Sequence, residues 1–263
     1  DDGPIGKGTR EILDALDAHC TKATFFMVGR MALAYPDTVK DVERRGHTIG
    51  AHTWSHANLG ARSEASGAEE VEKGFSAVAA ALGKPVAPFF RFPYLSDPDR
   101  MLDYLKKRNV AIWGIDVDSY DTRGFGSSRI AKWTLDHVKA EGKGVILFHD
   151  IKSTTRNAIP AILAELKAAG FKVVHLKPKT MLATDAGQDQ LVAERFDRLT
   201  GKLKTETKSK SKSAATHASL TDAGDTAAPK SKSRRTAKRR AGKRKRRTEA
   251  EVITTVRPGT RGT

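Results

Sequence analysis

The stretch Ala51-His52-Thr53-Trp54-Ser55-His56 places two histidines four residues apart directly after a short apolar segment. On one turn of a helix, two such side chains point the same way, so both imidazoles can reach one metal ion. A third ligand must come from elsewhere in the chain, and Asp1 or Asp2 offers a carboxylate. This spacing is a weak signal by itself, because it is common on ordinary helices. Whether the two histidines mark a metal site therefore depends on the rest of the sequence.

The rest of the chain to about residue 176 alternates between two kinds of segment. Apolar and β-branched runs predict strands over residues 23–29, 47–51, 88–94, 110–115, 144–148 and 171–174. Helical spacing of apolar residues predicts helices over residues 8–20, 39–45, 65–82, 97–108, 128–139 and 158–169. Strands that alternate with helices of this length indicate parallel βαβ units, so the predicted fold class is α/β. The chain opens inside an apparent motif, and we expect one further strand before Asp1.

Polar clusters follow the predicted strands. They are Asp1-Asp2, His52 with His56, Arg91 to Tyr94, Asp116 to Asp121, and His149-Asp150. Open parallel sheets and barrels both carry their active sites at the carboxyl ends of the strands. We therefore expect all five clusters to meet on one rim. Periodicity alone leaves the choice between sheet and barrel open.

The positive charge of the chain is concentrated at its end. The formal net charge is +16, and residues from Lys202 onward account for +14 of it. The preceding residues are nearly neutral, so the charge says little about their substrate. Cys20 is the single cysteine, which excludes an intramolecular disulfide. No apolar run approaches the length that a membrane span requires.

Four motifs in order resemble those of a known family. Asp1-Asp2-Gly3-Pro4 resembles the end of a TFDDGP motif, and His52 to His56 resembles an H[ST]xxH-type metal motif. Arg91-Phe92-Pro93-Tyr94 resembles an RxPY motif, and Leu147-Phe148-His149-Asp150 resembles the tail of an LxxxHD-type signature. Residues 1–176 thus resemble the polysaccharide deacetylases, carbohydrate esterase family four, with its NodB-like homology domain. The resemblance implies a distorted (β/α) barrel of about seven strands.

The resemblance also implies a metal site. Asp2, His52 and His56 would bind a divalent metal, usually zinc. Zinc held by two histidines and one carboxylate keeps a position open for water and lowers the pKa of that water toward 7.

Acid–base roles follow from the same resemblance. Asp1 would be the general base, and Arg91 would hold its carboxylate in place. His149 would be the general acid, and Asp121 could hydrogen-bond it and favour its charged form. The backbone N–H of Tyr94 would face the oxyanion.

The expected substrate pocket contains Tyr94 and Leu147, and it departs from the family at one position. Where the family has DxxDW, the chain reads Asp118-Ser119-Tyr120-Asp121-Thr122. The missing tryptophan normally helps to wall the acetyl pocket together with the leucine that Leu147 matches. Thr122 therefore leaves the acyl preference open.

These observations predict a metal-dependent hydrolase that removes N-acetyl groups from chitooligosaccharide, peptidoglycan or another glycan containing N-acetylglucosamine. One alternative is a hydrolase of another linear amide or of a cyclic imide. A second is an inactive barrel that carries a polyanion-binding tail. Family resemblance implies a secreted or cell-envelope location.

We predict three regions along the chain. Residues 1–180 form the deacetylase domain, 181–203 a weakly helical connector, and 204–263 a disordered tail rich in Lys and Arg. The run Lys243-Arg244-Lys245-Arg246-Arg247 would bind polyanions such as an anionic envelope polymer, without base-specific nucleic-acid recognition because no aromatics interleave. A solubilising extension is the alternative for this tail.

Overall fold

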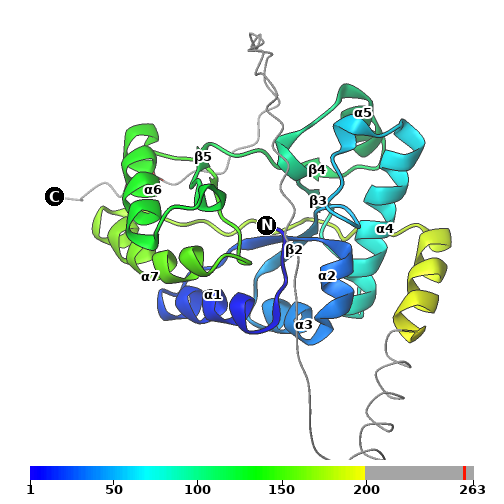
Figure 1. Cartoon of the computed structure of the whole chain (residues 1–263), viewed down its shortest axis with the longest axis horizontal. Coiled ribbons are helices and arrows are strands. Elements are labelled where there is room, and N and C mark those ends of the chain that lie inside the picture. Colours follow the sequence, from blue (N-terminus) through cyan, green and yellow to red (C-terminus); the bar gives the residue numbers. More distant parts are fainter. Residues whose placement is uncertain (199–256, 259–263) are drawn as a thin grey trace, which may run out of the picture. The chain divides into compact units, whose positions relative to one another are not determined.

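The computed structural model describes residues 1–198 and 257–258 of the chain. Figure 1 shows strands and helices alternating along the sequence, which confirms the α/β class. The helices are α1 Gly6–Ala18, α2 Gly29–Ala34, α3 Pro36–Arg44, α4 Glu64–Leu82, α5 Asp99–Lys107, α6 Ser127–Glu141 and α7 Ser153–Ala168, and residues 186–198 are also helical. Three 3₁₀ turns are Leu59–Ala61, Pro93–Leu95 and Asp121–Arg123. The strands are β1 Thr24–Met27, β2 Thr48–Ala51, β3 Phe89–Phe90, β4 Ala111–Ile112, β5 Val117–Asp118, β6 Ile146–Leu147, β7 Phe171–Lys172 and β8 Arg257–Pro258.

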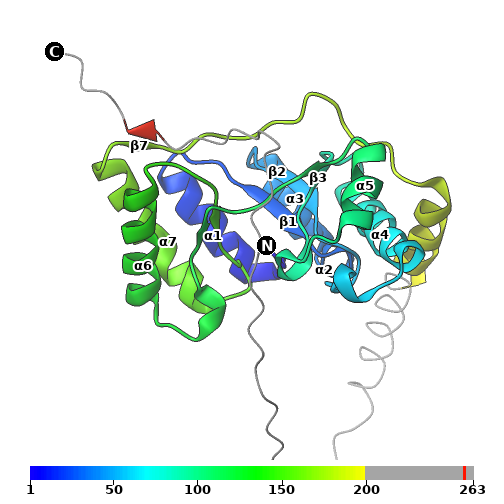
Figure 2. The same cartoon turned by 90° about the horizontal axis from the view of Figure 1, so that it is seen from above.

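The parallel strands form two groups. β1 to β4 make a four-stranded sheet in that order, and β5 pairs with β6. Each group has helices of its own, since α2 packs against α4 and α6 packs against α7. Figures 1 and 2 show these two groups of helices on opposite sides of the amino terminus. The start of the chain therefore lies between the two parallel sheets.

Buried apolar side chains hold each group together. Met27, Phe75 and Phe90 belong to the larger cluster and are almost completely buried. Ile130 of α6 and Ile162 of α7 belong to a second cluster. Each fully buried side chain of this size contributes about 1.5–3 kcal/mol relative to an exposed one.

The helix α4 matters for the site and has clear ends. Ser63 caps its start, where the hydroxyl oxygen accepts the backbone N–H of Ser66. Gly83 ends it with a φ of 78°, a left-handed conformation that a glycine adopts without steric cost. The predicted helix over 65–82 differs from the observed one by a single residue.

Three expectations about the elements need correction. The helix expected over 39–45 begins earlier, at Pro36, and a separate helix α2, which was not expected, ends just before the non-helical Tyr35. Strand β5 was not predicted, since it has only two residues between polar neighbours. The last predicted strand, β7, pairs antiparallel with β8 and does not extend a parallel sheet. Two-residue strands leave almost no periodic signal in a sequence.

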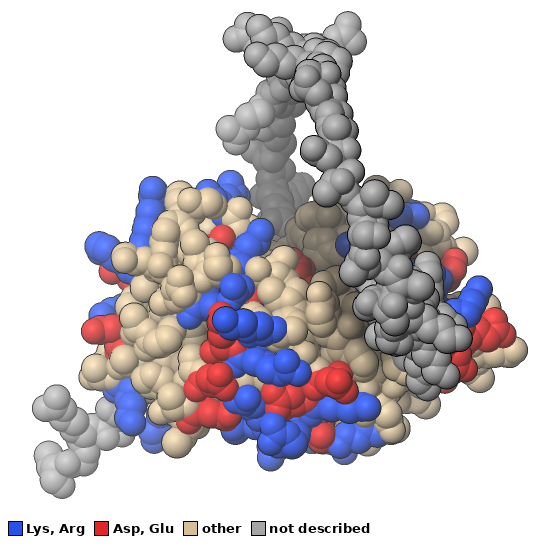
Figure 3. Space-filling view, turned by 60° about the horizontal axis from the view of Figure 1, so that its bottom comes forward, with Lys and Arg blue, Asp and Glu red and all other residues tan. Residues whose placement is uncertain are grey.

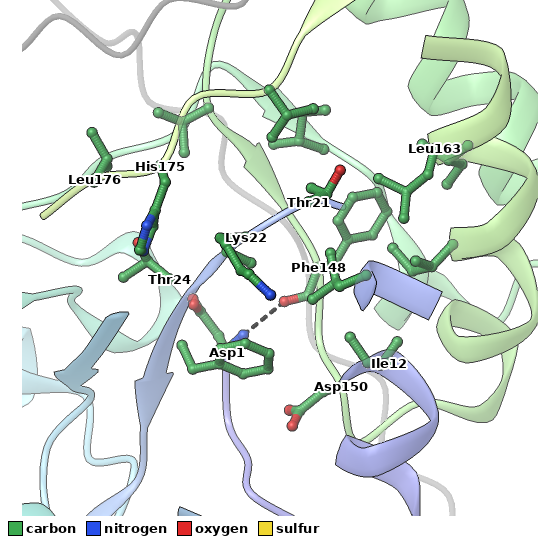
Figure 4. Close-up of a pocket in the computed structure, with 18 of the residues that line it drawn as sticks. Asp1, Ile12, Thr21, Lys22, Thr24, Phe148, Asp150, Leu163, His175 and Leu176 are labelled. Carbon is green, nitrogen blue, oxygen red and sulfur yellow. Dashed lines mark hydrogen bonds between the residues drawn. The ribbon is translucent and has the colours of Figure 1, made fainter. Parts of the chain in front are cut away.

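The predicted barrel is not closed by the ladders that the structure describes. Strand pairs among these residues form three sheets, and β1 and β6 are each an edge of a different sheet. A cavity of about 220 Å³ lies between them and is lined mainly by apolar side chains, among them Ile12, Phe148 and Leu163 (Figure 4). Asp1 lies at this cavity, and its amino group donates to the carbonyl oxygen of Phe148 at 2.7 Å.

Two expectations concern membrane spans and the tail. Among the helices that the structure describes, none has the length and apolar character needed to cross a bilayer. The predicted tail over 204–263 lies outside the described residues apart from the pair 257–258. The region boundaries at 180 and 203 therefore stay predictions.

Charged side chains of both signs interleave over the face formed by α1 and α3 (Figure 3). Arg45 lies within 4 Å of three carboxylates, those of Asp14, Asp17 and Asp41, and Arg10 also approaches Asp41. Exposed pairs of this kind stabilise a fold by at most about 1 kcal/mol each. This face therefore matches the small net charge that the sequence assigns to the folded part.

His47 is a buried histidine away from the polar clusters. It packs edge-on against the ring of Phe25, and its Nδ1 accepts the backbone N–H of Ala23 at 3.1 Å. Burial, reinforced by the nearby Lys22, lowers the pKa of His47 to about 4. In the unfolded chain, the pKa of a histidine is about 6.5. As the pH falls, His47 is therefore protonated in the unfolded state before it is protonated in the folded state.

We expect His47 alone to lower the free energy of unfolding by about 3 kcal/mol between pH 7 and pH 4. Its contribution is complete above the unfolded pKa and disappears as the pH approaches the folded pKa. His47→Asn keeps an acceptor for Ala23 without a titrating ring, so unfolding of this variant should depend less on pH. Urea denaturation at several pH values measures the difference, with the exposed His137→Asn as the control. Identical pH slopes for His47→Asn and the unsubstituted chain would contradict the expectation.

Candidate active site

The carboxylate of Asp2 faces two imidazoles. Its Oδ1 lies 3.4 Å from His52 Nε2 and 3.1 Å from His56 Nε2, and one ligand atom of each residue lies within 4.8 Å of the others. The end of β1 joins the two segments. The backbone N–H of His52 donates to the carbonyl oxygen of Met27 at 2.9 Å, and the N–H of Val28, directly after the strand, donates to the carbonyl oxygen of Gly3 at 3.1 Å. Three potential metal ligands from separate parts of the sequence therefore meet at one point.

His52 presents a nitrogen lone pair to this point. Its Nδ1 lies 2.6 Å from the carbonyl oxygen of Arg91, which can only accept, so Nδ1 carries the proton. Burial lowers the pKa of His52 to about 4, so the ring is neutral at pH 7 and its Nε2 is unprotonated. Asp2 Oδ1 is buried and accepts no hydrogen bond from any residue that the structure describes. Two buried acceptors that face each other repel, and a cation between them removes the repulsion. This donor set fits a divalent metal such as zinc.

The two histidines lie on a loop, so the expected helical turn is wrong. β2 ends at Ala51, and residues 52–56 form no helix. Thr53 and His56 have φ angles of 65° and 63°, which bend the chain and bring the imidazole centroids of His52 and His56 within 5.0 Å. The four-residue spacing correctly predicted that the two imidazoles lie close together, but a bent loop brings them together in place of a helix.

A buried ion pair lies next in sequence to the candidate metal ligand Asp2. Arg91 donates from Nη1 to Asp1 Oδ1 at 2.9 Å, and both side chains are almost inaccessible to solvent. Its other nitrogens donate to the carbonyl oxygens of Trp113 at 3.0 Å and Gly114 at 3.2 Å, while its guanidinium stacks over Phe26. Burial lowers the pKa of Arg91 to about 10, so the guanidinium remains charged at pH 7. The arginine is thus fixed at all its nitrogens and fixes the Asp1 carboxylate in turn.

A second acid, Asp121, holds the ring and the backbone of His149. Asp121 Oδ1 lies 2.8 Å from His149 Nδ1, and its Oδ2 accepts the backbone N–H of His149 at 2.7 Å and the hydroxyl of Thr155 at 2.6 Å. Burial alone would raise the pKa of Asp121, but the hydrogen bonds from His149 and Thr155 outweigh it and hold the pKa below its usual range. The carboxylate of Asp121 places a ring proton on Nδ1 of His149. The other ring nitrogen, Nε2, lies on the side of Asp2, whose Oδ2 is 4.0 Å away.

Comparison with known proteins places this geometry in a family. The sequence model described as polysaccharide deacetylase matches residues 1–113. A peptidoglycan-N-acetylglucosamine deacetylase of Bacillus cereus is 32% identical over 181 residues, which make up 65% of this chain and 65% of that protein. The solved structure of the Bc1960 peptidoglycan N-acetylglucosamine deacetylase is 31% identical with a TM-score of 0.61, and the match covers 65% of this chain and 80% of that one. The chain belongs to the polysaccharide deacetylase family.

A further member of the polysaccharide deacetylase family extends the comparison. The structure of a peptidoglycan deacetylase from Bdellovibrio bacteriovorus is 33% identical with a TM-score of 0.64, and the match covers 68% of this chain and 51% of that one. The chain therefore spans slightly less than two thirds of the Bacillus cereus relative and about half of the Bdellovibrio protein.

Two residues expected in the substrate pocket of this deacetylase-family chain differ in exposure. Tyr94 is 67% exposed, has a φ of 60°, and its ring meets His56 edge-on with centroids 4.7 Å apart. Leu147 is buried in β6, where it is paired with Asp118 of β5. Tyr94 thus contacts one of the candidate metal ligands directly. Leu147 is placed two residues before His149, and its contact with a substrate stays a prediction.

Only one acid of the Asp116–Asp121 cluster reaches the active site. Asp116 accepts the backbone N–H of Val145 and so ties the residue before β5 to the residue before β6. Asp118 accepts the backbone N–H of Tyr120 at 2.8 Å and stabilises a local turn. The indole N–H of Trp133 donates to the carbonyl oxygen of Asp118 at 3.1 Å and holds this loop from α6. Thr122, which replaces the family's tryptophan, is exposed.

Sequence reasoning missed Thr155 as a neighbour of the site, and it placed Asp150 in a cluster with His149 without giving it a role. Thr155 completes the hydrogen bonds to Asp121 from α7. Asp150 is buried beneath Gly3, where a Cβ would collide with its carboxylate, and it accepts the hydroxyl of Thr9 at 2.5 Å. Burial raises the pKa of Asp150, although the neighbouring amino terminus opposes this. Asp150 follows His149 in the recognised motif, but no pattern marked Thr155, because a hydroxyl partner has no fixed spacing.

Proposed function

We propose that this chain hydrolyses N-acetyl groups on polysaccharides or oligosaccharides that contain N-acetylglucosamine and releases acetate. One arrangement carries the proposal: three potential metal-ligating atoms meet at Asp2, which follows the Asp1 carboxylate held by Arg91 and lies 4.0 Å from the ring of His149, held by Asp121. An amide is a poor electrophile with a poor leaving group, so hydrolysis needs assistance at both ends. This arrangement offers a base and an acid beside a candidate metal site.

We propose that Asp2, His52 and His56 hold a divalent metal, with zinc favoured by two imidazoles and one carboxylate. When bound, the metal would polarise the acetyl carbonyl and make water a stronger nucleophile. The neutral ring of His52 supports this role, because its Nε2 is free of a proton at pH 7. Its Nδ1–H donates to a backbone carbonyl, the bond that orients metal-ligating histidines in general.

The remaining residues would move protons and stabilise charge. Asp1 takes a proton from the attacking water, and its hydrogen bond to Arg91 keeps the carboxylate oriented. The backbone N–H of Tyr94 donates to the oxygen that becomes negative as the carbonyl is attacked. His149 Nε2 then gives a proton to the nitrogen as the carbon–nitrogen bond breaks, while Asp121 stabilises the charged ring before that step. The water oxygen ends in acetate, and the free amine stays on the sugar.

The substrate class that we propose is peptidoglycan or chitooligosaccharide. The names of the relatives, which are peptidoglycan deacetylases, support a cell-wall substrate and a place at the cell envelope. The exposed ring of Tyr94 would border the sugar, and Leu147 would border the acetyl methyl group. Two rivals are a hydrolase of another linear amide or cyclic imide and an inactive barrel with a polyanion-binding tail. Thr122 keeps the first rival open, because the family's pocket tryptophan is absent.

We also propose that the two parallel sheets belong to one distorted barrel of about seven strands. The apolar cavity between the edge strands β1 and β6 supports this arrangement. Residues 1–180 would form this domain, followed by a connector over 181–203 and the tail over 204–263.

Acetate release tests the function. We expect the chain to release acetate from N-acetylglucosamine oligomers or peptidoglycan, to lose more than about 90% of the rate with a chelator, and to regain it with zinc. Amide and cyclic imide substrates without a sugar, assayed in parallel, distinguish the first rival. Turnover that is insensitive to the chelator, or no turnover although metal is bound, would count against the proposal.

A further inference from the structure

The loop that carries His52 and His56 is hydrogen-bonded to helix α4 through one residue, Glu70. Its Oε2 accepts the backbone N–H of Ser55 at 2.9 Å, and its Oε1 accepts the hydroxyl of Ser55 at 2.8 Å. The carbonyl oxygen of Glu70 accepts the backbone N–H of Trp54 at 2.8 Å. All three bonds thus fall on the residues immediately before the second metal ligand.

The opposite side of the loop is bonded to α2. The backbone N–H groups of Gly29 and Arg30 donate to the carbonyl oxygens of Thr53 at 2.9 Å and Trp54 at 3.0 Å. Gly74 of α4 lies so close that a Cβ there would be 2.6 Å from the carbonyl carbon of Thr53. The backbone between the histidines is therefore held between two helices. From α4, the side chain of Glu70 supplies hydrogen bonds, and the Lys73 ammonium lies over the ring of Trp54 at 5.1 Å.

This attachment matters because the loop conformation is unfavourable by itself. Thr53 and His56 both have positive φ angles, which non-glycine residues adopt only where the surroundings impose them. A loop free to relax would change the distance and angle between the two imidazoles. Metal affinity depends on that geometry, and residues outside the ligand set typically contribute about 10–100-fold to it.

We propose that Glu70 is a positioning residue that sets the geometry of His52 and His56 for the metal through its bonds to Ser55. The inference rests on the metal site of the proposed function. Glu70 does not coordinate the metal itself: its two carboxylate oxygens are taken up by the Ser55 backbone and hydroxyl. Its effect should therefore appear in metal affinity and ligand geometry, and should be restored by any side chain that keeps both bonds.

The test compares Glu70→Ala and Glu70→Gln in the full chain. We expect Glu70→Ala to weaken zinc binding by about 10-fold or more in calorimetry and to change the visible spectrum of the cobalt-substituted site. Glu70→Gln should stay within about threefold of the unsubstituted chain, because its amide oxygen accepts the Ser55 N–H and its amide N–H₂ donates to the Ser55 hydroxyl. Glu69→Ala, an exposed neighbour on the same helix, is the matched control.

Different outcomes separate this inference from the proposed function. If the unsubstituted chain binds zinc and releases acetate while Glu70→Ala binds zinc equally well with the same cobalt spectrum, the positioning role is refuted and the function stands. If the unsubstituted chain binds no metal, the proposed function and the inference fail together. Should Glu70→Ala not fold, Ser55→Ala removes the hydroxyl bond alone and should still weaken binding measurably, and unchanged affinity there would overturn the inference.

Discussion

Asp2→Asn should weaken divalent-metal binding and slow acetate release by more than about 100-fold. Residues outside the ligand set alone typically contribute about 10–100-fold to metal affinity, and losing a charged ligand should exceed that range. Asparagine is the appropriate replacement because Asp2 has a φ of 73°, a conformation that asparagine tolerates better than alanine. The substitution therefore removes the negative charge between His52 and His56 with little change in backbone preference.

Calorimetry with zinc and an acetate assay measure the effect on Asp2→Asn. The control is Asp97→Asn, which removes a charge from an exposed position away from the ligands. Near-normal metal binding by Asp2→Asn would show that the carboxylate is not a ligand. Normal binding with lost turnover would reassign Asp2 to an acid–base role.

Asp121→Asn should lower kcat by about 100-fold or more without weakening metal binding, because general acid catalysis typically contributes 10²–10⁴-fold. The Asp121 carboxylate accepts three hydrogen bonds, one from the His149 ring, one from its backbone and one from Thr155. An asparagine oxygen can replace Oδ2, but its N–H₂ then faces His149 Nδ1 and requires that nitrogen to be unprotonated. The charged ring therefore loses its partner, and a neutral ring with its proton on Nε2 is a much weaker acid than the imidazolium.

Separate measurement of kcat, KM and zinc affinity tests this second expectation. A fall in kcat at constant zinc affinity supports an action through His149, whereas equal losses in both would indicate damage to the whole site. Asp136→Asn is the control, since Asp136 is exposed on α6 and pairs with Lys132. Full activity of Asp121→Asn would show that His149 needs no carboxylate partner.

Most of the helices were predictable from sequence, and the shortest strands were not. The helix α4 was predicted to within one residue, because apolar side chains recur at helical spacing along it and Gly83 directly follows its last residue. β5 has two residues and no periodicity to detect, and the break between α2 and α3 depended on Tyr35 leaving the helical conformation before Pro36. Local signals thus determine long elements, while tertiary contacts decide short ones.

The candidate site divides in a similar way. The motifs gave the identities of Asp1, Asp2, His52, His56 and Arg91, and the structure brings them together. The motif spacing also suggested a helical turn for the histidines, which is wrong, since spacing of four is compatible with a bent loop as well. A pattern in sequence can specify which groups meet without specifying the backbone that brings them together.

By itself, the sequence determined the α/β class, the family resemblance and the side chains able to carry the chemistry, because these depend on local periodicity and on residue type at fixed spacing. Only the tertiary structure decided which nitrogen of His52 bears the proton, that Thr155 supports Asp121, and that Glu70 is hydrogen-bonded to Ser55 between the two histidines. Each of these depends on hydrogen bonds between residues that lie 15 to 39 positions apart in the chain. Such bonds form only after folding has brought the partners together, so no local pattern records them.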